Sequence, residues 1–323
     1  MITLVAGIDI GGTNQTVAIA TPEGDVLTRS RAQRPPGGTA EDLVRSISAL
    51  LEEALAEAAQ ATPGTQLTGI GIGFGGPVDH AQGTILTSHH VAGWSGFPLR
   101  QTLTERFGVP VVLDNDANAG ALGEARFGVG HDFSDFLYVN IGAGIGGGII
   151  VRNRLLRGAH GLAGEIGHMT VVPGGAPCDC GKRGCLEAYA SGRSLGRRAR
   201  AATSADPTAG AAILALAGGR SDAVDGHHLM QAATAGDRLA LTLVRQTAGY
   251  LGLALGNAAN LLGPAAIILG GGVAGAGDVL LTPLREHLAW HLMPGMPAPA
   301  ILQAALGYDA GVMGAIALAL ELG

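Results

Sequence analysis

Aromatic residues, charged residues and long apolar runs are all scarce in this chain of 323 residues. Aromatic side chains make up 4% of it and charged side chains 14%. No uninterrupted apolar stretch reaches the roughly 20 residues that a membrane-spanning helix needs. The N-terminus, MITLVAGIDI, has neither a cationic lead nor a cleavage site. We therefore expect a cytoplasmic protein with no membrane partner.

Basic residues are too few and too scattered for a nucleic-acid-binding protein. The formal net charge is −6, whereas a protein that holds phosphate backbones needs a basic face. The densest basic segment, Arg193–Arg200, spreads its charges around a predicted helix and is interpreted as a solvated face. We expect no nucleic-acid partner.

Cysteine is confined to one short segment, and glycine is abundant without a fixed period. Three cysteines within eight residues do not form the framework of a secreted disulfide-rich protein. The 54 glycines are scattered between apolar runs, which excludes collagen-like and low-complexity classes. Glycines of this kind are typical of turns and of close backbone approach.

The length and the order of predicted elements indicate two α/β domains. At 323 residues the chain exceeds one ordinary core. Each half opens with a strand, a glycine turn and a second strand, which suggests related domains facing each other across a cleft. We expect one domain over residues 1–117 plus 310–323 and another over 118–309. Predicted strands cover residues 4–10, 16–20, 26–31, 67–74, 110–113, 136–141, 148–151 and 265–269. Predicted helices follow Thr39 and cover 116–127, a segment from Glu187, 237–262 and 310–322.

Two glycine turns are candidates for binding nucleotide phosphates, because converging backbone N–H groups bind anions. They are Asp9–Asn14 and Asn140–Gly148, and neither has the pattern of a P-loop or a dinucleotide fingerprint. A lone turn of this kind can equally be a tight hairpin, but its recurrence in both halves favours a nucleotide clamp. Asp9 is a candidate Mg²⁺ ligand. The expected nucleotide contacts are Asp9, Gly11, Gly12, Thr13, Asn14, Gly142, Ala143 and Gly144.

A third glycine segment follows the apolar run Ile267–Leu269. Three successive glycines, Gly270, Gly271 and Gly272, offer a flat backbone surface for an adenosine ring. An ordinary loop between a strand and a helix is an equal alternative at this point.

The segment Asp114–Asn118 carries a candidate catalytic base. It follows a predicted buried strand and opens a helix. Asp116 is placed to accept the proton of a sugar hydroxyl as its oxygen attacks phosphorus, a contribution of roughly 10²–10⁴ in rate. Helix capping by Asp114 and Asn115 is the alternative interpretation, although four polar side chains in five residues exceed what a cap needs.

His168, Cys178, Cys180 and Cys185 form a candidate Cys₃His zinc site. A free-thiol or redox cluster is the alternative. The expected role of the metal is to shape a loop, with the second ring nitrogen of His168 turned to a sugar hydroxyl. Glu165 and Glu187 flank this loop and are candidate acceptors for sugar hydroxyls, although an isolated Glu is most often a surface charge.

The chain resembles the ROK family (repressors, unassigned reading frames and sugar kinases), and especially its bacterial ATP-dependent glucokinases. The resemblance covers essentially the whole sequence and rests on DIGGTN, LDNDAN, GAGIGGG, GEIGH, CDCGKRGCLE and ILGGG, in that order. The combination of GEIGH with the cysteine segment is the most specific part.

The resemblance implies an actin-like (ribonuclease H-like) two-domain sugar kinase fold, with ATP and sugar in a central cleft. It also implies that Asp116 is the catalytic base, that structural Zn²⁺ binds the Cys₃His set, and that the protein is a homodimer or homotetramer. The sugar ligands by analogy are Gly75, Gly76, Asn115, Asp116, Glu165, His168 and Glu187.

Two positions depart from the family pattern. Ala143 stands where the second glycine turn usually has Thr, so that a hydroxyl facing phosphate is missing. His89-His90 replaces a Pro-Asn pair near the sugar pocket of relatives. We expect a hexose kinase with glucose as the first substrate to test, and mannose, fructose, N-acetylglucosamine or N-acetylmannosamine as alternatives. ATP or polyphosphate remains open as the donor.

Two other functional classes are weaker. A sugar-sensing repressor of this family carries a DNA-binding segment ahead of the DIGGTN strand, and Asp9 lies too near the start to leave room for one. A sugar-binding relative with little catalysis would explain Ala143, but the base and the acidic sugar ligands are all present.

Overall fold

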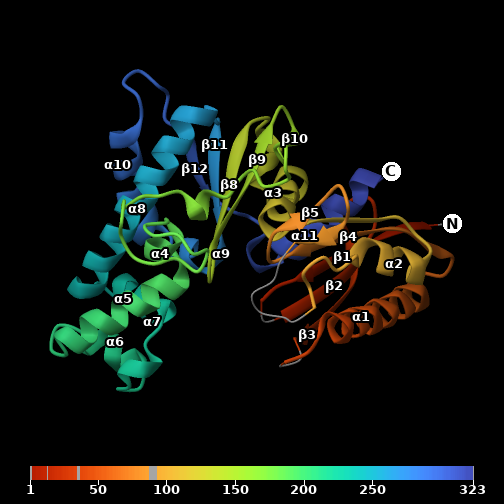
Figure 1. Ribbon diagram of the computed structural model, residues 1–323, viewed down its shortest axis with the longest axis horizontal. Coiled ribbons are helices and arrows are strands. Elements are labelled where there is room, and N and C mark those ends of the chain that lie inside the picture. The colour runs from red at the N-terminus through yellow and green to blue at the C-terminus, as the bar shows by residue number, and fades with distance from the viewer. Residues whose placement is uncertain (1, 13, 35–36, 87–92, 323) are drawn as a thin grey trace. The chain divides into compact units, whose positions relative to one another are not determined.

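The computed structural model describes residues 2–12, 14–34, 37–86 and 93–322 (Figure 1). These residues form two compact units. Unit 1 comprises Met1–Ser134, Gly148–Gly164 and Ala305–Gly323, and unit 2 comprises Asp135–Gly147 and Glu165–Ala304. Within the described residues, none of the helices combines the length and apolarity needed to span a membrane.

Unit 1 is built on a five-stranded mixed sheet in the order β3-β2-β1-β4-β7. An antiparallel meander of β1 (Ile2–Ile10), β2 (Asn14–Ala20) and β3 (Val26–Gln33) forms one side. The strands β4 (Thr65–Phe74) and β7 (Val111–Asn115) add to β1 in parallel. A short hairpin of β5 (Val78–Asp79) and β6 (Thr84–Ile85) stands apart from this sheet.

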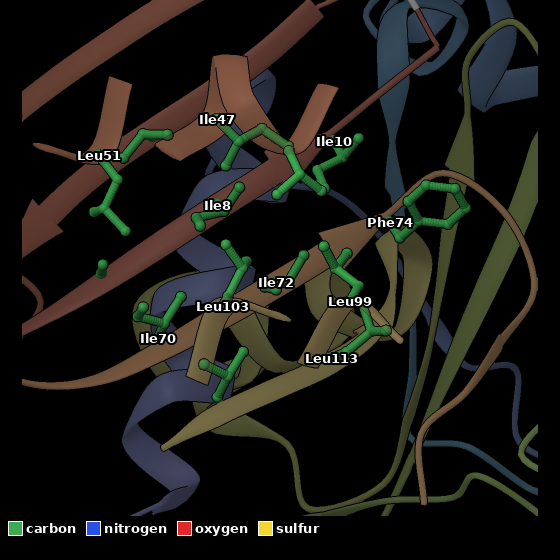
Figure 2. Close-up of a cluster of buried hydrophobic side chains, with 14 of the residues drawn as sticks. Ile8, Ile10, Ile47, Leu51, Ile70, Ile72, Phe74, Leu99, Leu103 and Leu113 are labelled. Atoms are coloured by element: carbon green, nitrogen blue, oxygen red, sulfur yellow. The ribbon is translucent and has the colours of Figure 1, made fainter. Parts of the chain in front are cut away.

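The helices α1 (Ala40–Ala61) and α2 (Leu99–Phe107) bury one face of this sheet. The core between these helices and the sheet holds alternate residues of the strands, including Ile8, Ile10 and Ile72 (Figure 2). Helix α1 begins as the sequence predicts, because Thr39 and Asp42 form a reciprocal capping box. The opposite face is covered by α11 (Ala310–Ala319).

Glycines let α11 lie directly on the backbone of β1 and β4. Gly7 and Gly71 are paired across these strands. A Cβ at Gly7 would lie 2.6 Å from the Val312 carbonyl oxygen, and one at Gly71 would overlap that of Ala315. Helix α3 (Asp116–Phe127) packs on the other side of α11, where Gly314 approaches the Ala119 carbonyl. Unit 1 therefore closes around α11.

A second five-stranded sheet has the order β10-β9-β8-β11-β12, and unit 2 contains β8, β11 and β12 of this sheet. Its strands are β8 (Phe136–Ile141), β9 (Ile145–Val151), β10 (Arg154–Leu155), β11 (Ala266–Gly270) and β12 (Ala300–Gln303). Strand β11 pairs in parallel with both β8 and β12. The residues of β9 and β10 from Gly148 onward belong to unit 1.

The helices of unit 2 lie mostly between its cysteine segment and β12. They are α4 (Glu187–Ala190), α5 (Gly192–Ala205), α6 (Ala211–Leu216), α7 (Gly226–Thr234), α8 (Arg238–Leu262), α9 (Gly271–Ala274) and α10 (Asp278–His291). Helix α8 matches the helix predicted over 237–262; it begins after an Asp237 cap and ends at Gly263 in the left-handed conformation. Helix α10 packs closely on α8, where Gly252 and Gly256 meet His287 and His291.

The predicted strands and helices are confirmed, with shifts of a few residues at their ends. The compact units differ from the division expected after residue 117. Unit 1 continues to Ser134 because α3 packs on α11, and it also includes residues 148–164. Segments that contact each other, and not sequence order, define the units.

The interpretation of Arg193–Arg200 as a solvated face is wrong for part of the segment. Arg198 is half-buried and donates to the Tyr189 carbonyl at 2.9 Å and to Thr247 Oγ1 at 2.8 Å. Arg200 donates to the Val224 carbonyl. These two guanidinium groups join α5 to neighbouring segments because backbone carbonyls at helix ends lack partners of their own.

Candidate active site

Unit 1 holds the first glycine turn at the end of β1. Gly11 donates its N–H to the Asn14 carbonyl at 3.0 Å, which closes the turn, while Gly12 is exposed with open space around its Cα. Thr13 lies outside the described residues. The exposed backbone of Gly12 fits the predicted role of the turn in holding an anion.

Asp9 precedes this turn and is largely buried at the start of α11. A Cβ at Gly311 would lie 2.7 Å from the Asp9 carboxylate carbon, so the first turn of α11 packs directly on this group. Burial and the negative charge of Asp116 raise the pKa of Asp9 to about 7, and the positive charge of Arg31 opposes them. Asp9 and Asp116, separate in sequence, therefore act on one another in the fold.

The turn after β4 brings a further predicted residue to the same place. Gly75 donates its N–H to the Ile10 carbonyl at 2.9 Å. A Cβ at Gly75 would lie 3.8 Å from the Gly11 Cα and 3.7 Å from Asp116 Oδ2. Gly75, Gly11 and Asp116 thus meet at one edge of the unit 1 sheet, as expected for neighbouring parallel strands. Gly76 follows in the same turn, with its N–H bonded to the Phe74 carbonyl at 2.8 Å.

Asp116 is the first residue of α3, and Asn115 is the cap of this helix. The Asn115 side-chain oxygen accepts the N–H of Asn118 at 2.7 Å. The capping interpretation is therefore confirmed for Asn115, whose amide NH₂ group still points away from this bond. The helix N-terminus also favours the ionised form of a carboxylate beside it.

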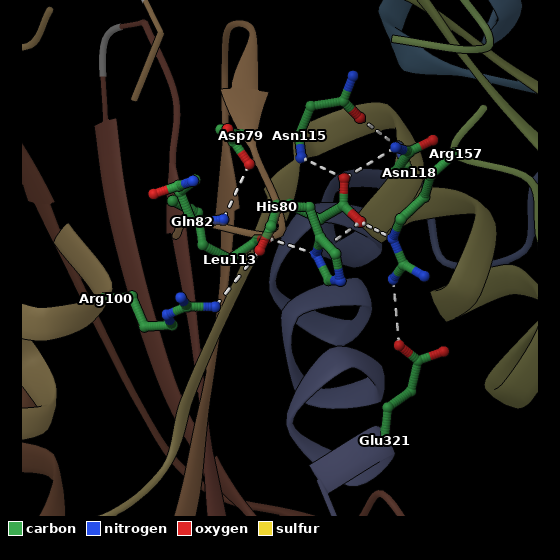
Figure 3. Close-up of polar contacts among 10 residues, drawn as sticks. Asp79, His80, Gln82, Arg100, Leu113, Asn115, Asn118, Arg157 and Glu321 are labelled. Atoms are coloured by element: carbon green, nitrogen blue, oxygen red, sulfur yellow. Dashed lines mark hydrogen bonds and ion pairs between the residues drawn. The ribbon is translucent and has the colours of Figure 1, made fainter. Parts of the chain in front are cut away.

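Asp114 does not have the capping role that the sequence suggested for it. Its side chain is 1% exposed, and one oxygen accepts hydrogen bonds from the Asn115 N–H and the Asn118 amide, both at 2.8 Å. The other oxygen lies 2.7 Å from Arg157 Nε and 3.5 Å from His80 Nδ1 (Figure 3). Asp114 is a buried anchor and not a helix cap.

The partners of Asp114 come from segments that the sequence did not single out. Arg157 also contacts Glu321 at 3.2 Å, and His80 Nδ1 lies 2.8 Å from the Leu113 carbonyl oxygen (Figure 3). A lone Arg and a lone His carry no local signal. Only the buried carboxylate, which requires a partner of opposite charge, indicates that such residues exist.

The predicted zinc ligands converge in unit 2. The donor atoms of His168, Cys178, Cys180 and Cys185 all lie within 4.8 Å of one another. The Cys180 and Cys185 sulfurs are 3.7 Å apart, and the Cys178 sulfur is 3.8 Å from His168 Nδ1. Ligands about 2.0–2.3 Å from a central ion in a tetrahedron are separated by about 3.3–3.8 Å. These two distances match that range, and the identities of all four donors suit zinc.

The backbone of this loop depends on glycines at two of its turns. Gly181 and Gly184 have φ values of 85° and 82°, which favour glycine. A Cβ at Gly184 would overlap the Val172 carbonyl oxygen. Burial raises the pKa of the Cys178 thiol to about 12, so that a metal must displace its proton on binding.

Glu165 and Glu187 flank this loop as expected, but their surroundings differ. His168 Nε2 faces Glu165 Oε2 at 3.8 Å, on the side of the ring away from Cys178. Glu187 Oε2 accepts the Ile145 N–H at 2.8 Å and lies against Gly144. One oxygen of Glu187 therefore holds the second glycine turn, which no sequence signal indicated.

Two more contacts join the segment after Cys185 to that turn. Gly192 donates its N–H to the Gly142 carbonyl at 2.8 Å, and Arg193 Nε donates to the Ala143 carbonyl at 3.1 Å. The turn itself closes through Gly142 N–H and the Gly144 carbonyl at 3.0 Å, and a side chain at Gly142 would meet open space. The cysteine segment and the second glycine turn are thus one connected structure.

The glycines after β11 differ in their surroundings. A Cβ at Gly270 would meet the Tyr138 hydroxyl, and one at Gly271, where φ is 83°, would meet the Ile141 carbonyl. These two glycines let β11 and β8 end close together. Gly272 alone has no atom within 4 Å of a built Cβ. It is the open part of the predicted adenosine surface.

The comparisons with known proteins agree on one family. A family model described as the ROK family matches residues 5–322. The glucokinase of Streptomyces coelicolor is 37% identical over 320 residues, covering 98% of each chain. A xylose repressor of Caldicellulosiruptor bescii is 34% identical, covering 87% of this chain and 69% of the repressor.

A solved structure confirms the fold class. The crystal structure of a ROK family glucokinase from Streptomyces griseus, in complex with glucose and AMPPNP, matches with a TM-score of 0.85. The two sequences are 40% identical, and the match covers 99% of this chain and 100% of that chain. The expected actin-like α/β sugar kinase fold is confirmed.

Proposed function

The chain belongs to the ROK family, and on this basis we propose that it is an ATP-dependent glucokinase. It transfers the terminal phosphoryl group of ATP to the 6-hydroxyl of glucose. The observation that carries the proposal is the meeting of Asp116, Gly75 and Gly11 at one edge of the unit 1 sheet, beside the buried Asp9. A base next to a phosphate-binding turn is what phosphoryl transfer to an alcohol requires.

Asp116 is the general base. As the sugar oxygen forms its bond to the terminal phosphorus, the hydroxyl proton passes to the Asp116 carboxylate, and the bond from phosphorus to the bridging oxygen breaks to release ADP. Mg²⁺, when bound, neutralises charge on the phosphates, and Asp9 offers the carboxylate oxygen that this ion prefers. Gly12 supplies a backbone donor to the same phosphates, as Thr13 and Asn14 do in our assignment. The Gly11 N–H closes the turn, so Gly11 contributes a close approach of the backbone to the phosphates.

The sugar ligands are Gly75, Gly76, Asn115, Glu165, His168 and Glu187, together with the base. Several contacts support this assignment. The capping bond of Asn115 uses only its oxygen, which leaves the NH₂ group for a hydroxyl. Glu187 Oε2 holds the Ile145 N–H, which leaves the other oxygen as an acceptor. When Nδ1 of His168 binds the metal, Nε2 remains for the sugar.

Structural Zn²⁺ in the Cys₃His set completes the assignment, with the second glycine turn, Gly142–Gly144, and the open Gly272 as nucleotide contacts. The missing hydroxyl at Ala143 removes one donor, but the backbone of the turn is held by Glu187 and Arg193. A cytoplasmic location and a homodimer or homotetramer stay predictions. His89 and His90 lie outside the described residues, so the choice of hexose rests on the relatives.

The first experiment is ADP release from Mg-ATP with glucose, mannose, fructose, N-acetylglucosamine and N-acetylmannosamine. We expect the highest kcat/KM with glucose. A preference for another hexose would keep the mechanism and change the substrate, and polyphosphate in place of ATP tests the donor. No turnover of any sugar by zinc-replete protein would refute the kinase and favour sugar binding alone.

A further inference from the structure

Arg31 on β3 lies in register with the buried Asp9. Asp9 of β1 pairs with Thr16 of β2, and Thr16 pairs with Arg31. Residues paired across antiparallel strands point to the same face of a sheet. Two strand spacings amount to about 10 Å, a distance that an extended Arg side chain spans in large part. The Arg31 side chain therefore lies on the same face of the sheet as Asp9, next to the first glycine turn.

Asp9, Thr16 and Arg31 line a cavity of about 280 Å³ in unit 1. Gly11, Gly12 and Asn14 of the turn line it from one side, and Tyr308 and Asp309 ahead of α11 from another. The volume is close to the lower end of small-molecule sites, about 300 Å³. It suits a charged group of a ligand better than a whole nucleoside.

Two arginines line the cavity, and among the described residues Arg29 has an ion-pair partner within 4.0 Å whereas Arg31 has none. Arg29, two residues earlier on β3, is paired with Asp309 at 2.8 Å. Within the described ranges, no carboxylate lies within the 4.0 Å ion-pair distance of Arg31. Its positive charge still acts on Asp9, where it opposes the effects of burial and of Asp116 on the pKa. An exposed guanidinium beside a backbone anion site is arranged to receive an anion.

We propose that Arg31 is a phosphate-binding residue that donates hydrogen bonds to the terminal phosphates of the donor nucleotide at the Asp9 turn. The inference rests on the proposed function, since it assumes a nucleotide at this turn. Guanidinium binds phosphate through two parallel N–H groups and remains charged at all working pH values. It would add charge neutralisation on the side of the cavity opposite the turn amides.

The test is the affinity for Mg-AMPPNP, measured by calorimetry in Arg31→Gln, Arg31→Lys and the unchanged protein. We expect Arg31→Gln to weaken binding about tenfold, the typical loss for a charge-assisted hydrogen bond. Arg31→Lys should recover only part of this loss, because an ammonium lacks the two-pronged geometry. Glucose affinity in the same proteins should stay within about twofold, because Arg31 contacts only the nucleotide.

Arg45→Gln is the matched control. Arg45 is an exposed arginine on α1, which covers the other face of the sheet, and it pairs with Asp42. The Arg45→Gln variant should bind Mg-AMPPNP with the same affinity as the unchanged protein. Unaltered AMPPNP affinity in Arg31→Gln would overturn the inference. Full recovery in Arg31→Lys would overturn the paired guanidinium contact, since a single positive charge would then be enough to hold the phosphate.

The inference and the proposed function fail in different ways. A protein that binds Mg-AMPPNP through Arg31 but phosphorylates no hexose would support the inference and refute the glucokinase. A glucokinase whose nucleotide affinity and kcat/KM for ATP are unchanged in Arg31→Gln would refute the inference alone.

Discussion

Arg157 Nε lies 2.7 Å from Oδ2 of Asp114, and this carboxylate is almost fully buried. Asp114 also holds the backbone of Asn115 and the side chain of Asn118, so the ion pair fixes the junction at which α3 begins. Asp116 is the first residue of that helix. The position of the proposed catalytic base, Asp116, therefore depends on the guanidinium of Arg157, which lies 41 residues further along the chain.

Removing Arg157 should cost both stability and turnover. Arg157→Leu leaves the Asp114 charge buried without its partner, which typically destabilises a protein by about 3–5 kcal/mol. We expect urea unfolding to show a loss of this order, and kcat to fall while the KM for ATP changes little. Arg154→Leu, an exposed position on β10, is the control. Equal stability of the two variants would show that the ion pair anchors nothing.

Replacing the base should remove chemistry and leave binding. Asp116→Asn keeps the size of the side chain and the start of α3 but cannot accept the proton, so kcat should fall by about 10²-fold or more. Glucose affinity by calorimetry should change little, and the circular dichroism spectrum should be unaltered. A variant with near-normal kcat would exclude Asp116 as the base.

Loss of one thiolate should affect more than the metal. Cys185→Ser is expected to lose stoichiometric zinc, as measured by mass spectrometry, together with stability and glucose affinity. Nucleotide affinity should fall as well, because Glu187 and Arg193 connect the cysteine segment to the second glycine turn.

Asp179→Ala is the control for this variant, since its exposed side chain lies between two of the cysteines without belonging to the metal set. It should retain zinc. Stoichiometric zinc in Cys185→Ser would contradict the Cys₃His assignment.

The buried Asp9 should make the metal-free and nucleotide-free protein less stable as pH rises. The folded pKa of about 7 lies above the ordinary value of 3.8. The resulting loss in the free energy of unfolding is therefore absent below about pH 4. It grows as Asp9 ionises in the unfolded chain, and it is complete above pH 7. Asp9→Asn carries no such charge. Its stability relative to the unchanged protein should rise by about 2–3 kcal/mol between pH 5 and 8.

Urea unfolding at several pH values in EDTA measures this difference. Asp25→Asn, an exposed residue of the turn before β3, should show no comparable gain. A constant difference between Asp9→Asn and the unchanged protein across this range would mean that Asp9 ionises freely in the fold. The same variant should be a poor enzyme, because the carboxylate that destabilises the metal-free protein is the one proposed to bind Mg²⁺.

Much of the fold follows from local signals in the sequence. Thr39 and Asp42 mark the start of α1 by a reciprocal cap, and Asp237 marks that of α8, because these bonds form between residues three apart. The Cys₃His cluster is also predictable, since three of its four residues lie within eight positions and thiol side chains are rare in this chain. Local pattern and tertiary structure agree at these places.

Long-range partners were not predictable from the same signals. The Glu187 carboxylate meets the Ile145 N–H, and a backbone donor leaves no mark in a sequence. Arg198 belongs to a basic segment that looks solvated, yet it reaches Thr247 on α8. The pattern of charge on one helix does not show which neighbouring helix supplies acceptors. Such pairs depend on packing between segments dozens of residues apart.

The placement of α11 has a consequence for how the protein is made. Unit 1 needs α11 against β1 and β4, yet a ribosome synthesises α11 only after every residue of unit 2. Since domains fold as units during synthesis, unit 2 has its long run of residues 165–304 available while unit 1 still lacks a cover on one sheet face. Nascent unit 1 therefore exposes Val5 and Ala18, and chaperone binding should persist until α11 emerges.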